Sequence, residues 1–257
     1  MRRPPAKSLL PALLLTLGSL SLTPSCADNN SSMFAVGVIA LDPSTCVAEP
    51  DDTATMLAGG VIDLAFTQTY TGYLLVGNQL TQRGSREQIR TETSRVNLRG
   101  AEIRLMTPDG TQLANYSTVG TGFVNAADGE VASYGAMSVN IIPSALFADP
   151  KLDLANKGLV VAKIRVFGDT LGNTAVTSSE LDFPIRICTG CLVRYPSDAA
   201  DTQTMAGGAY KCATASTASS ATPLPCIIGQ DGSFPCTACS AALELCHDPT
   251  QNPSYGP

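Results

Sequence analysis

Cysteine is the residue type whose spacing in this sequence could support chemistry. Two Cys-x-x-Cys pairs lie in the last third of the chain, Cys188 with Cys191 and Cys236 with Cys239. Pairs of this kind supply the thiolates of a zinc site, the redox centre of a thioredoxin-like enzyme, or structural disulfides. The elements that carry the pairs and the compartment that holds the protein decide between these three roles.

The sequence favours disulfides over the other two roles. Zinc ribbons place their two pairs about 15–20 residues apart, whereas 44 residues lie between Cys191 and Cys236. A thioredoxin-type centre begins a helix of a βαβ unit, and residues 192–196 have no helical pattern. Disulfides require only an oxidising compartment. We therefore predict disulfides, and neither a metal ion nor any other cofactor.

The first 25 residues indicate such a compartment. Arg2, Arg3 and Lys7 form a positive region, and an apolar stretch of 14 residues follows at positions 9–22. Small and turn-forming residues then lead to Cys26. This is the layout of a secretory signal peptide. The apolar stretch is also shorter than the about 20 residues that a transmembrane helix needs.

The residues before Cys26 resemble the lipobox of bacterial lipoproteins. In that family a small residue, here Ser25, precedes a cysteine that takes a diacylglycerol thioether, and the signal peptide is cleaved before that cysteine. The resemblance implies a lipidated Cys26 that anchors the protein, and Ala27 after it suits sorting to the outer membrane. Residues 26–32 would then be a short polar tether. The alternative is ordinary signal cleavage without lipid.

Composition limits the class of partner and of fold. Removal of residues 1–25 takes away three of the 16 basic residues and none of the 22 acidic ones, which leaves 232 residues with a formal charge of −9. An acidic surface argues against binding to nucleic acid or to anionic lipid headgroups. Only 15% of the residues are charged, and Trp is absent. This composition, with no long helical period, favours an extracytoplasmic all-β protein.

Residues 33–187 consist of short apolar runs separated by turn residues, which predicts a series of β-strands. In residues 159–167 and 181–187 apolar residues alternate with polar ones. Because Pro184 has no N–H to donate, the second of these strands should lie at an edge or meet its neighbour away from that position. Residues 81–94 carry charges without an apolar face and should form an exposed loop. The expected strands are residues 33–41, 61–66, 70–76, 101–106, 112–119, 138–142, 159–167 and 181–187.

This pattern predicts an immunoglobulin-like β-sandwich over residues 33–187, with a closed barrel as the main alternative. Residues 188–248 change character, because they are rich in cysteine and low in apolar residues. They predict a small, loop-rich module that disulfides stabilise. Residues 249–257 read as a disordered C-terminus.

The cysteine count predicts four bridges. Without a lipidated Cys26, eight cysteines remain, which is an even number. Seven of them lie in residues 188–246, so one must pair with the remaining cysteine, Cys46. Because part of the first strand often runs parallel beside the last in immunoglobulin-like sandwiches, we expect Cys46 to be bridged to Cys188 or, failing that, to Cys191. The predicted bridge cysteines are Cys46, Cys188, Cys191, Cys212, Cys226, Cys236, Cys239 and Cys246.

Residues suited to catalysis are sparse. His247 is the one histidine and lies near the C-terminus, and no Gly-x-Ser-x-Gly nucleophile motif is present. Asp51, Asp52 and Asp109 could bind Ca²⁺ as loop oxygens, but their positions favour turn chemistry. We therefore predict no catalytic, metal or cofactor site.

The chain as a whole resembles the cysteine-rich lipoproteins of myxobacteria, with a lipobox, a β-sandwich and a cysteine tail that contains Cys-x-x-Gly-Gln-Asp-Gly, here residues 226–232. The resemblance implies no particular activity. We expect a membrane-anchored surface lipoprotein of the outer membrane with a non-catalytic binding or structural role. Its partner would be an envelope protein or a polysaccharide. The alternative is an extracytoplasmic hydrolase that uses a carboxylate pair.

Overall fold

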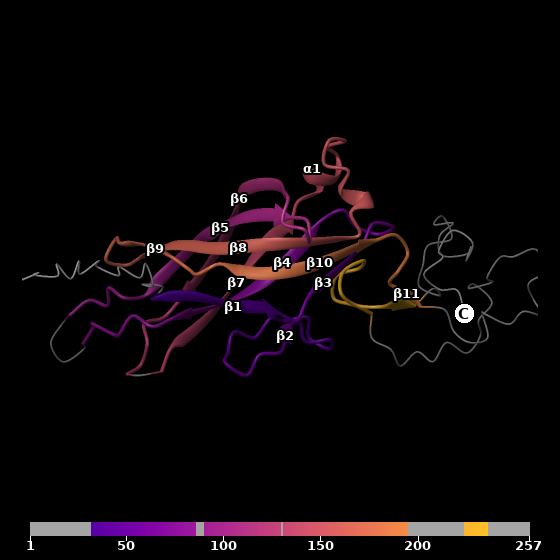
Figure 1. Cartoon of the computed structure of the whole chain (residues 1–257). Coiled ribbons are helices and arrows are strands. Elements are labelled where there is room, and N and C mark those ends of the chain that lie inside the picture. The colour runs from indigo at the N-terminus through magenta and orange to yellow at the C-terminus, as the bar shows by residue number, and fades with distance from the viewer. Residues whose placement is uncertain (1–31, 86–89, 130, 195–223, 236–257) are drawn as a thin grey trace, which may run out of the picture. The chain divides into compact units, whose positions relative to one another are not determined.

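The computed structural model of the chain describes residues 32–85, 90–129, 131–194 and 224–235. The described residues form two β-sheets that lie face to face (Figure 1). No helix within these ranges is long and apolar enough to cross a membrane.

The first sheet has the strand order β2-β1-β4-β7, and all its neighbours are antiparallel. Its strands are β1 (Met33–Ile39), β2 (Met56–Leu57), β4 (Tyr70–Asn78) and β7 (Ser133–Ile142).

The second sheet has the order β3-β10-β8-β5-β6, and the short strand β9 pairs with β8. Its neighbours are antiparallel except β3 and β10, which run parallel. The strands are β3 (Gly60–Asp63), β5 (Val96–Met106), β6 (Gln112–Val124), β8 (Leu159–Thr170), β9 (Ala175–Thr177) and β10 (Leu181–Cys188). A helical turn α1 (Ser144–Phe147) and a 3-10 turn η1 (Leu154–Asn156) connect β7 to β8.

The topology confirms the predicted immunoglobulin-like sandwich. The N-terminal part of the sandwich is divided between the two sheets, because β1 pairs with β4 in one and β3 pairs in parallel with β10 in the other. The strand that lies parallel beside the last is thus β3, the second of the expected strands, whereas part of the first strand was expected there.

Alternating side chains make the core between the sheets. In β8, Val160, Ala162, Ile164 and Val166 are fully buried, while Arg165 on the other face is exposed. The remaining strands of both sheets contribute to the same buried cluster. The period of two in the sequence therefore located the inner face correctly.

All eight expected strands are present, and the differences lie at their ends. β5 and β7 begin five residues earlier than expected, in segments that contain Gly100 and Gly135. A register shift beside Gly100 interrupts the alternation there, so the sequence pattern hid the start of β5. Pro184 has no backbone N–H to donate to a neighbouring strand. The four residues of β10 that pair with β3 begin one residue later, at Ile185.

The predicted exposed loop is confirmed in part, because its described residues run from exposed at Thr81 to buried at Ser94. Thr81, Gln82 and Arg83 are exposed. The carboxylate of Glu92 accepts hydrogen bonds from the backbone N–H groups of Arg83, Gly84 and Ser94 at 3.1, 2.9 and 2.5 Å. Desolvation raises the pKa of Glu92, but these N–H donors outweigh it and the pKa is lowered.

The disulfides correct the predicted partner of Cys46. Cys46 is bridged to Cys226 with Cα atoms 5.3 Å apart, and Cys188 is bridged to Cys191 with Cα atoms 5.9 Å apart. The inference that Cys46 pairs with a tail cysteine was right, but the named partners were wrong. The parallel neighbour of β10 is β3 rather than β1, and Cys46 lies in the excursion between β1 and β3, away from Cys188.

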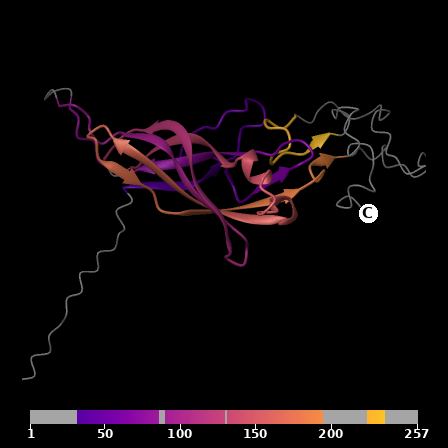
Figure 2. The ribbon, with the colours of Figure 1, turned by 90° about the horizontal axis from the view of Figure 1, so that it is seen from above.

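The described residues of the cysteine-rich tail pack on one end of the sandwich. The short strands β11 (Val193–Arg194) and β12 (Phe234–Pro235) pair in parallel. Val193 and Phe234 are buried, and the Phe234 ring lies 5.2 Å from the ring of Phe66 in the sandwich. Figure 2 shows residues 224–235, in yellow, at the end of the sandwich opposite to the start of β1.

Candidate binding pocket at the disulfide-clamped end

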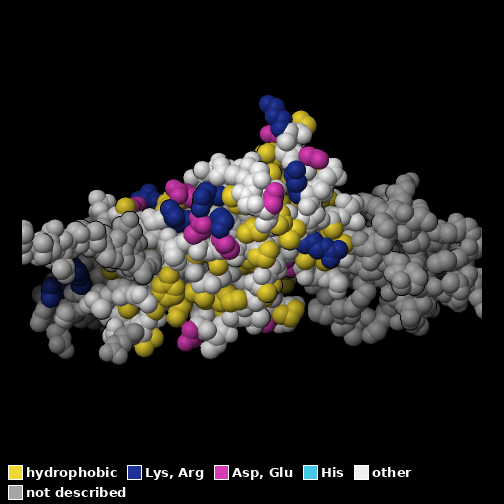
Figure 3. Space-filling view, viewed as in Figure 1, with side chains coloured by type: hydrophobic (Ala, Val, Ile, Leu, Met, Phe, Trp, Pro, Cys, Tyr) yellow, Lys and Arg dark blue, Asp and Glu magenta, His cyan; other side chains and the backbone are white. Residues whose placement is uncertain are grey.

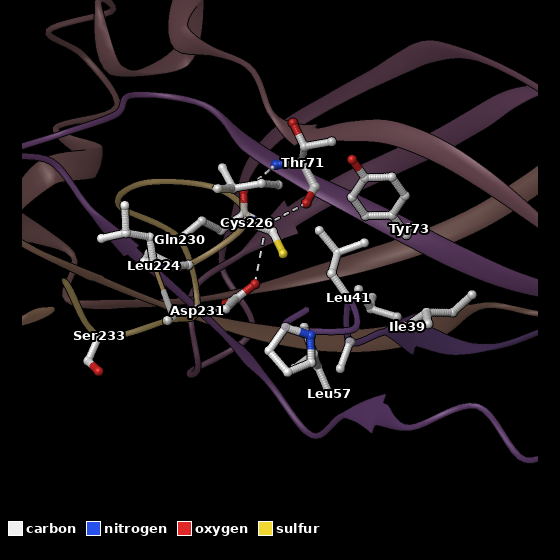
Figure 4. A pocket seen from close by; sticks show the side chains of 16 residues that line it. Ile39, Leu41, Leu57, Thr71, Tyr73, Leu224, Cys226, Gln230, Asp231 and Ser233 are labelled. Atoms are coloured by element: carbon white, nitrogen blue, oxygen red, sulfur yellow. Dashed lines mark hydrogen bonds between the residues drawn. The ribbon is translucent and has the colours of Figure 1, made fainter. Parts of the chain in front are cut away.

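The first sheet opens where β1 leaves β4. The pairing of these strands ends at Val38 and Leu74. On its other edge, β1 pairs with β2 at Val38 and Ile39. Residues 224–233 lie beside the opening and enclose a pocket of about 320 Å³ with β1, β2 and β4 (Figure 4). Residues distant in sequence thus build one concave site, the usual geometry of a ligand pocket.

Most of the wall of this pocket is apolar. Ile39, Leu41 and Leu57 contribute one side, and the tail contributes Leu224 and Ile227. Figure 4 shows Ile39, Leu41, Leu57 and Leu224 around the cavity, together with the phenol of Tyr73. Apolar walls with a few polar groups favour binding of a ligand with apolar parts.

Gln230 closes the edge of β4 at the back of the pocket. Its Oε1 accepts a hydrogen bond from the backbone N–H of Thr71 at 2.9 Å, and its Nε2 donates to the backbone oxygen of Thr71 at 2.6 Å. Gln230 is buried, so both bonds are shielded from water. Its side-chain amide thereby takes the place of a peptide group on a neighbouring strand.

Asp231 connects the tail to both sheets. Its Oδ1 accepts the backbone N–H of Val61 at 2.8 Å. Its Oδ2 accepts the Tyr70 hydroxyl at 2.8 Å and Gln230 Nε2 at 3.2 Å. Burial raises the pKa of Asp231, and these donors offset the rise only in part. Burial and then the charge of Asp231 raise the pKa of Tyr70.

The bridge from Cys46 to Cys226 fixes the other side of the tail segment. Cys46 follows a turn in which Asp42 Oδ1 accepts the N–H groups of Ser44 and Thr45, each at 2.8 Å. The hydrogen bond from the Ser44 hydroxyl, together with these N–H groups, lowers the pKa of Asp42 to about 2. The carboxyl group of Asp42 is therefore charged at neutral pH and accepts these bonds as a carboxylate.

A second bridge lies under the same end. The buried carboxylate of Asp63 accepts the N–H groups of Gly190 at 2.5 Å, Leu192 at 2.9 Å and Ala65 at 3.0 Å. It thus orders the loop that holds Cys188 and Cys191. One carboxylate oxygen and the two sulfurs lie within 4.8 Å of one another. Because the sulfurs are joined in a disulfide, they are not the thiolates that bind metals.

Charged residues gather on the outer face of the second sheet, over β5 and β8 (Figure 3). Lys163 Nζ lies 2.9 Å from Asp182 and 3.4 Å from Glu180, and Arg104 also pairs with Glu180. Desolvation raises the pKa of Glu180, but the two basic partners outweigh it and the pKa is lowered. Glu180 is therefore ionised at neutral pH and is a poor proton donor for hydrolysis.

The predicted site residues fall into three groups. Cys46, Cys188, Cys191 and Cys226 form the two described bridges. Asp51 and Asp109 accept bonds from the nearby threonines Thr53, Thr107 and Thr111, which is turn chemistry, as expected. Other predicted residues lie outside the described ranges, and these are Cys26, Cys212, Cys236, Cys239, Cys246 and His247.

The polar groups that build the pocket were not among the residues predicted from the sequence. Gln230 and Asp231 stood inside the Cys-x-x-Gly-Gln-Asp-Gly stretch, but nothing in its spacing connected them to Tyr70 or Thr71. A Gln-Asp-Gly run could have indicated a turn with αL geometry, and Asp231 does have a φ of 58°. Its contacts depend on the fold.

Comparison of the chain with protein-family models, with curated proteins and with solved structures found no match.

Proposed function

We propose that this chain is an exported, lipid-anchored protein of the cell envelope that binds a partner without catalysis, through the pocket at its disulfide-clamped end. The observation that carries the proposal is the preformed pocket. Its tail wall is fixed by the Cys46–Cys226 bridge and by the contacts of Gln230 and Asp231. A wall held in this way loses little conformational entropy when a ligand binds.

Export is supported by the disulfides together with the signal-like N-terminus. Disulfides persist in oxidising compartments such as the periplasm and the cell surface. Under this proposal Cys26 carries the lipid, and residues 26–32 join it to Met33 at the start of β1. Met33 and the pocket residue Ile39 are at the two ends of β1, six residue steps apart, so on the order of 20 Å of strand separates them. The chain that carries the proposed anchor therefore enters the sandwich about one strand length from the pocket.

The polar groups of the pocket support binding rather than hydrolysis. A glycosidase-type mechanism needs two carboxyl groups about 5–10 Å apart. Among the described residues that line the pocket, Asp231 supplies the single carboxyl group. Both of its oxygens are engaged by the tail and the sheets, so its role is to hold the wall.

An acidic mature chain supports a partner other than nucleic acid. An envelope protein is the partner that we favour over a polysaccharide. The described pocket wall offers Tyr73 as its one aromatic side chain, whereas sugar rings are commonly bound against aromatic faces.

A neutral apolar dye tests the binding site. N-phenyl-1-naphthylamine, which fluoresces in apolar surroundings, should bind the wild-type protein. Ala40→Trp would fill the pocket and should weaken dye binding at least about 10-fold. Val36→Trp is the matched control, because Val36 is on β1 but outside the pocket, and it should leave binding unchanged. Equal binding by all three proteins, or no binding by the wild type, would contradict the proposal.

A further inference from the structure

We infer that the ligand of the pocket is a basic peptide segment of a protein, in which an apolar side chain is followed closely by Lys or Arg. The inference rests on the proposed binding function and names the class of ligand. It is carried by the pocket, by a second hollow beside it and by the distribution of charge over this end of the molecule.

Charge is distributed unevenly over the described residues. Residues 32–82 and 224–235, which build the whole pocket, contain no Lys or Arg. The same segments contain Asp42, Glu49 and Asp231 among their acidic residues. Many of the described basic residues lie on the outer face of the second sheet (Figure 3). Near the clamped end, Arg186 lies in register with Val61 in β3 and Arg194 with Pro235 in β12, but neither residue lines the pocket. An acidic end attracts basic partners and repels acidic ones.

The second hollow has the chemistry to receive the basic group. It has a volume of about 300 Å³ and is lined by Asp42, Glu49 and Asp51. All three carboxyl groups belong to exposed residues. The pKa of Asp42 is lowered to about 2, first by the hydroxyl of Ser44, so this group is charged at neutral pH. The described lining includes no basic side chain that would neutralise them.

The two hollows lie on either side of one stretch of chain. Ile39, Ala40, Leu41 and Pro43 line both of them. Two sites that flank a single extended chain are on the order of 10 Å apart, about twice the spacing of neighbouring strands. An extended peptide covers this distance in about three residues. One ligand can therefore place an apolar side chain in the pocket and a basic one in the acidic hollow.

The edge of β4 at the back of the pocket is already occupied on both sides of Tyr73. Gln230 binds both backbone groups of Thr71, and β1 pairs with β4 from Leu74 onward. A ligand is therefore held by the apolar side chains of the pocket and by the carboxylates of the second hollow. A peptide can present an apolar and a basic side chain to both at once.

Displacement of the bound dye by three matched peptides tests this inference. Each is an acetylated and amidated hexapeptide with one leucine, followed after two glycines by a pair of lysines, of glutamines or of glutamates. The lysine peptide should displace the dye at least about 10-fold more effectively than the glutamine peptide, and added salt should reduce the difference. The glutamate peptide should be the weakest.

Substitutions locate the source of the preference. Glu49→Gln with Asp51→Asn should remove most of the advantage of the lysine peptide and leave dye binding intact. Glu180→Gln with Asp182→Asn makes the same change in net charge on the outer face of the second sheet and should leave the advantage unchanged. Both pairs of positions are exposed or partly exposed, so both variants should fold.

The outcomes separate the inference from the function that it deepens. In one outcome Ala40→Trp abolishes dye binding, but all three peptides displace the dye equally or no peptide displaces it. That result would overturn the basic-peptide inference and leave the binding function standing. An equal loss in both double variants would also overturn it. So would a concentration-dependent dimer that Ala40→Trp dissociates, because the occupant would then be a second copy of the chain. A wild type that binds no dye would instead contradict the proposed function itself.

Discussion

Asp231 is the residue on which the described tail depends most. Its carboxylate joins β3 through Val61, β4 through Tyr70 and its own segment through Gln230. Tyr70 is fully buried, and a Cβ atom at Gly60 would lie 2.3 Å from its hydroxyl oxygen, so the glycine leaves room for that hydroxyl. A buried polar group of this kind is stabilising only while all its partners are present.

Tyr70→Phe should destabilise the protein by about 1–3 kcal/mol, because it leaves Oδ2 of a buried carboxyl group with Gln230 as its one donor. Tyr73→Phe is the matched control. Its hydroxyl makes no hydrogen bond with the residues that the structure describes, so the change should stay within about 0.5 kcal/mol. Urea unfolding of the three proteins measures both effects. Similar losses in the two variants would contradict the assignment of the Tyr70 bond.

Asp231 also predicts a pH dependence. Burial raises its pKa in the folded protein above the ordinary value of 3.8. At a pH between the ordinary pKa and the raised pKa, the folded state therefore binds more protons than the unfolded state. The contribution of Asp231 to the free energy of unfolding thus decreases as the pH rises. That contribution is complete below the ordinary pKa and is reduced once the pH passes the raised one.

Asp231→Asn should remove this dependence, because Asn does not titrate. The free energy of unfolding of the wild type minus that of the variant should therefore fall from about pH 4 to about pH 7. Urea titrations at intervals across this range measure the difference. A difference that grows with pH would mean that hydrogen bonds to the charged form dominate over burial.

At the scale of elements, the two bridges differ in the length of chain that they close. Cys46 and Cys226 are 180 residues apart in sequence, whereas Cys188 and Cys191 are three apart. The bridge that closes the longer loop reduces the conformational entropy of the unfolded chain more than the other bridge does. The long bridge also holds residues 224–233 against the outer side of β1 and β4, and these residues make one wall of the pocket.

Replacement of both cysteines of the long bridge by Ala should cost about 5 kcal/mol, and the same change at Cys188 and Cys191 about 2 kcal/mol. Thermal and urea unfolding compare the two double variants with the wild type. Dye binding should be lost first in the Cys46→Ala and Cys226→Ala variant, because its pocket wall is released. A larger loss of stability in the short-bridge variant would show that the Asp63 loop, rather than chain entropy, decides the ranking.

At the scale of the whole molecule, the proposed anchor joins the sandwich at the end opposite to the pocket. β1 begins at Met33, and the pocket begins at Val38 near the other end of the same strand. The outer face of the second sheet does not line the proposed binding pocket. There the charges of Arg104 and Lys163 are paired with those of Glu180 and Asp182.

Cys26→Ser should move the protein from the membrane fraction to the soluble fraction, because the serine cannot form the thioether to the lipid. Fractionation with immunoblotting measures the change. The Cys46→Ala and Cys226→Ala variant is the control for loss of cysteine and should stay with the membrane. A Cys26→Ser protein that is processed normally and stays bound would contradict the lipid anchor.

The sequence by itself determined an all-β fold of short strands and the position of its inner face, and the two sheets of the structure then decided for a sandwich over a closed barrel. Alternation in β8 and β10 identifies Ile164 and Ile185 as core residues, because the side-chain period of a strand is local and needs no partner. Counting, with Cys26 set aside as the expected lipid site, likewise predicted that Cys46 pairs with the tail, and its bridge to Cys226 confirms that pairing. The start of β5 was hidden because the irregularity beside Gly100 breaks the period.

The tertiary structure alone decided which cysteine Cys46 meets and where the pocket lies. Both depend on how β1 and β3 are divided between two sheets, and a one-dimensional pattern does not contain that division. Gln230 meets Thr71 across 159 residues, and Asp231 meets Val61 across 170. Contacts over such separations form only when the strands between them have folded, so no spacing in the sequence marks them in advance.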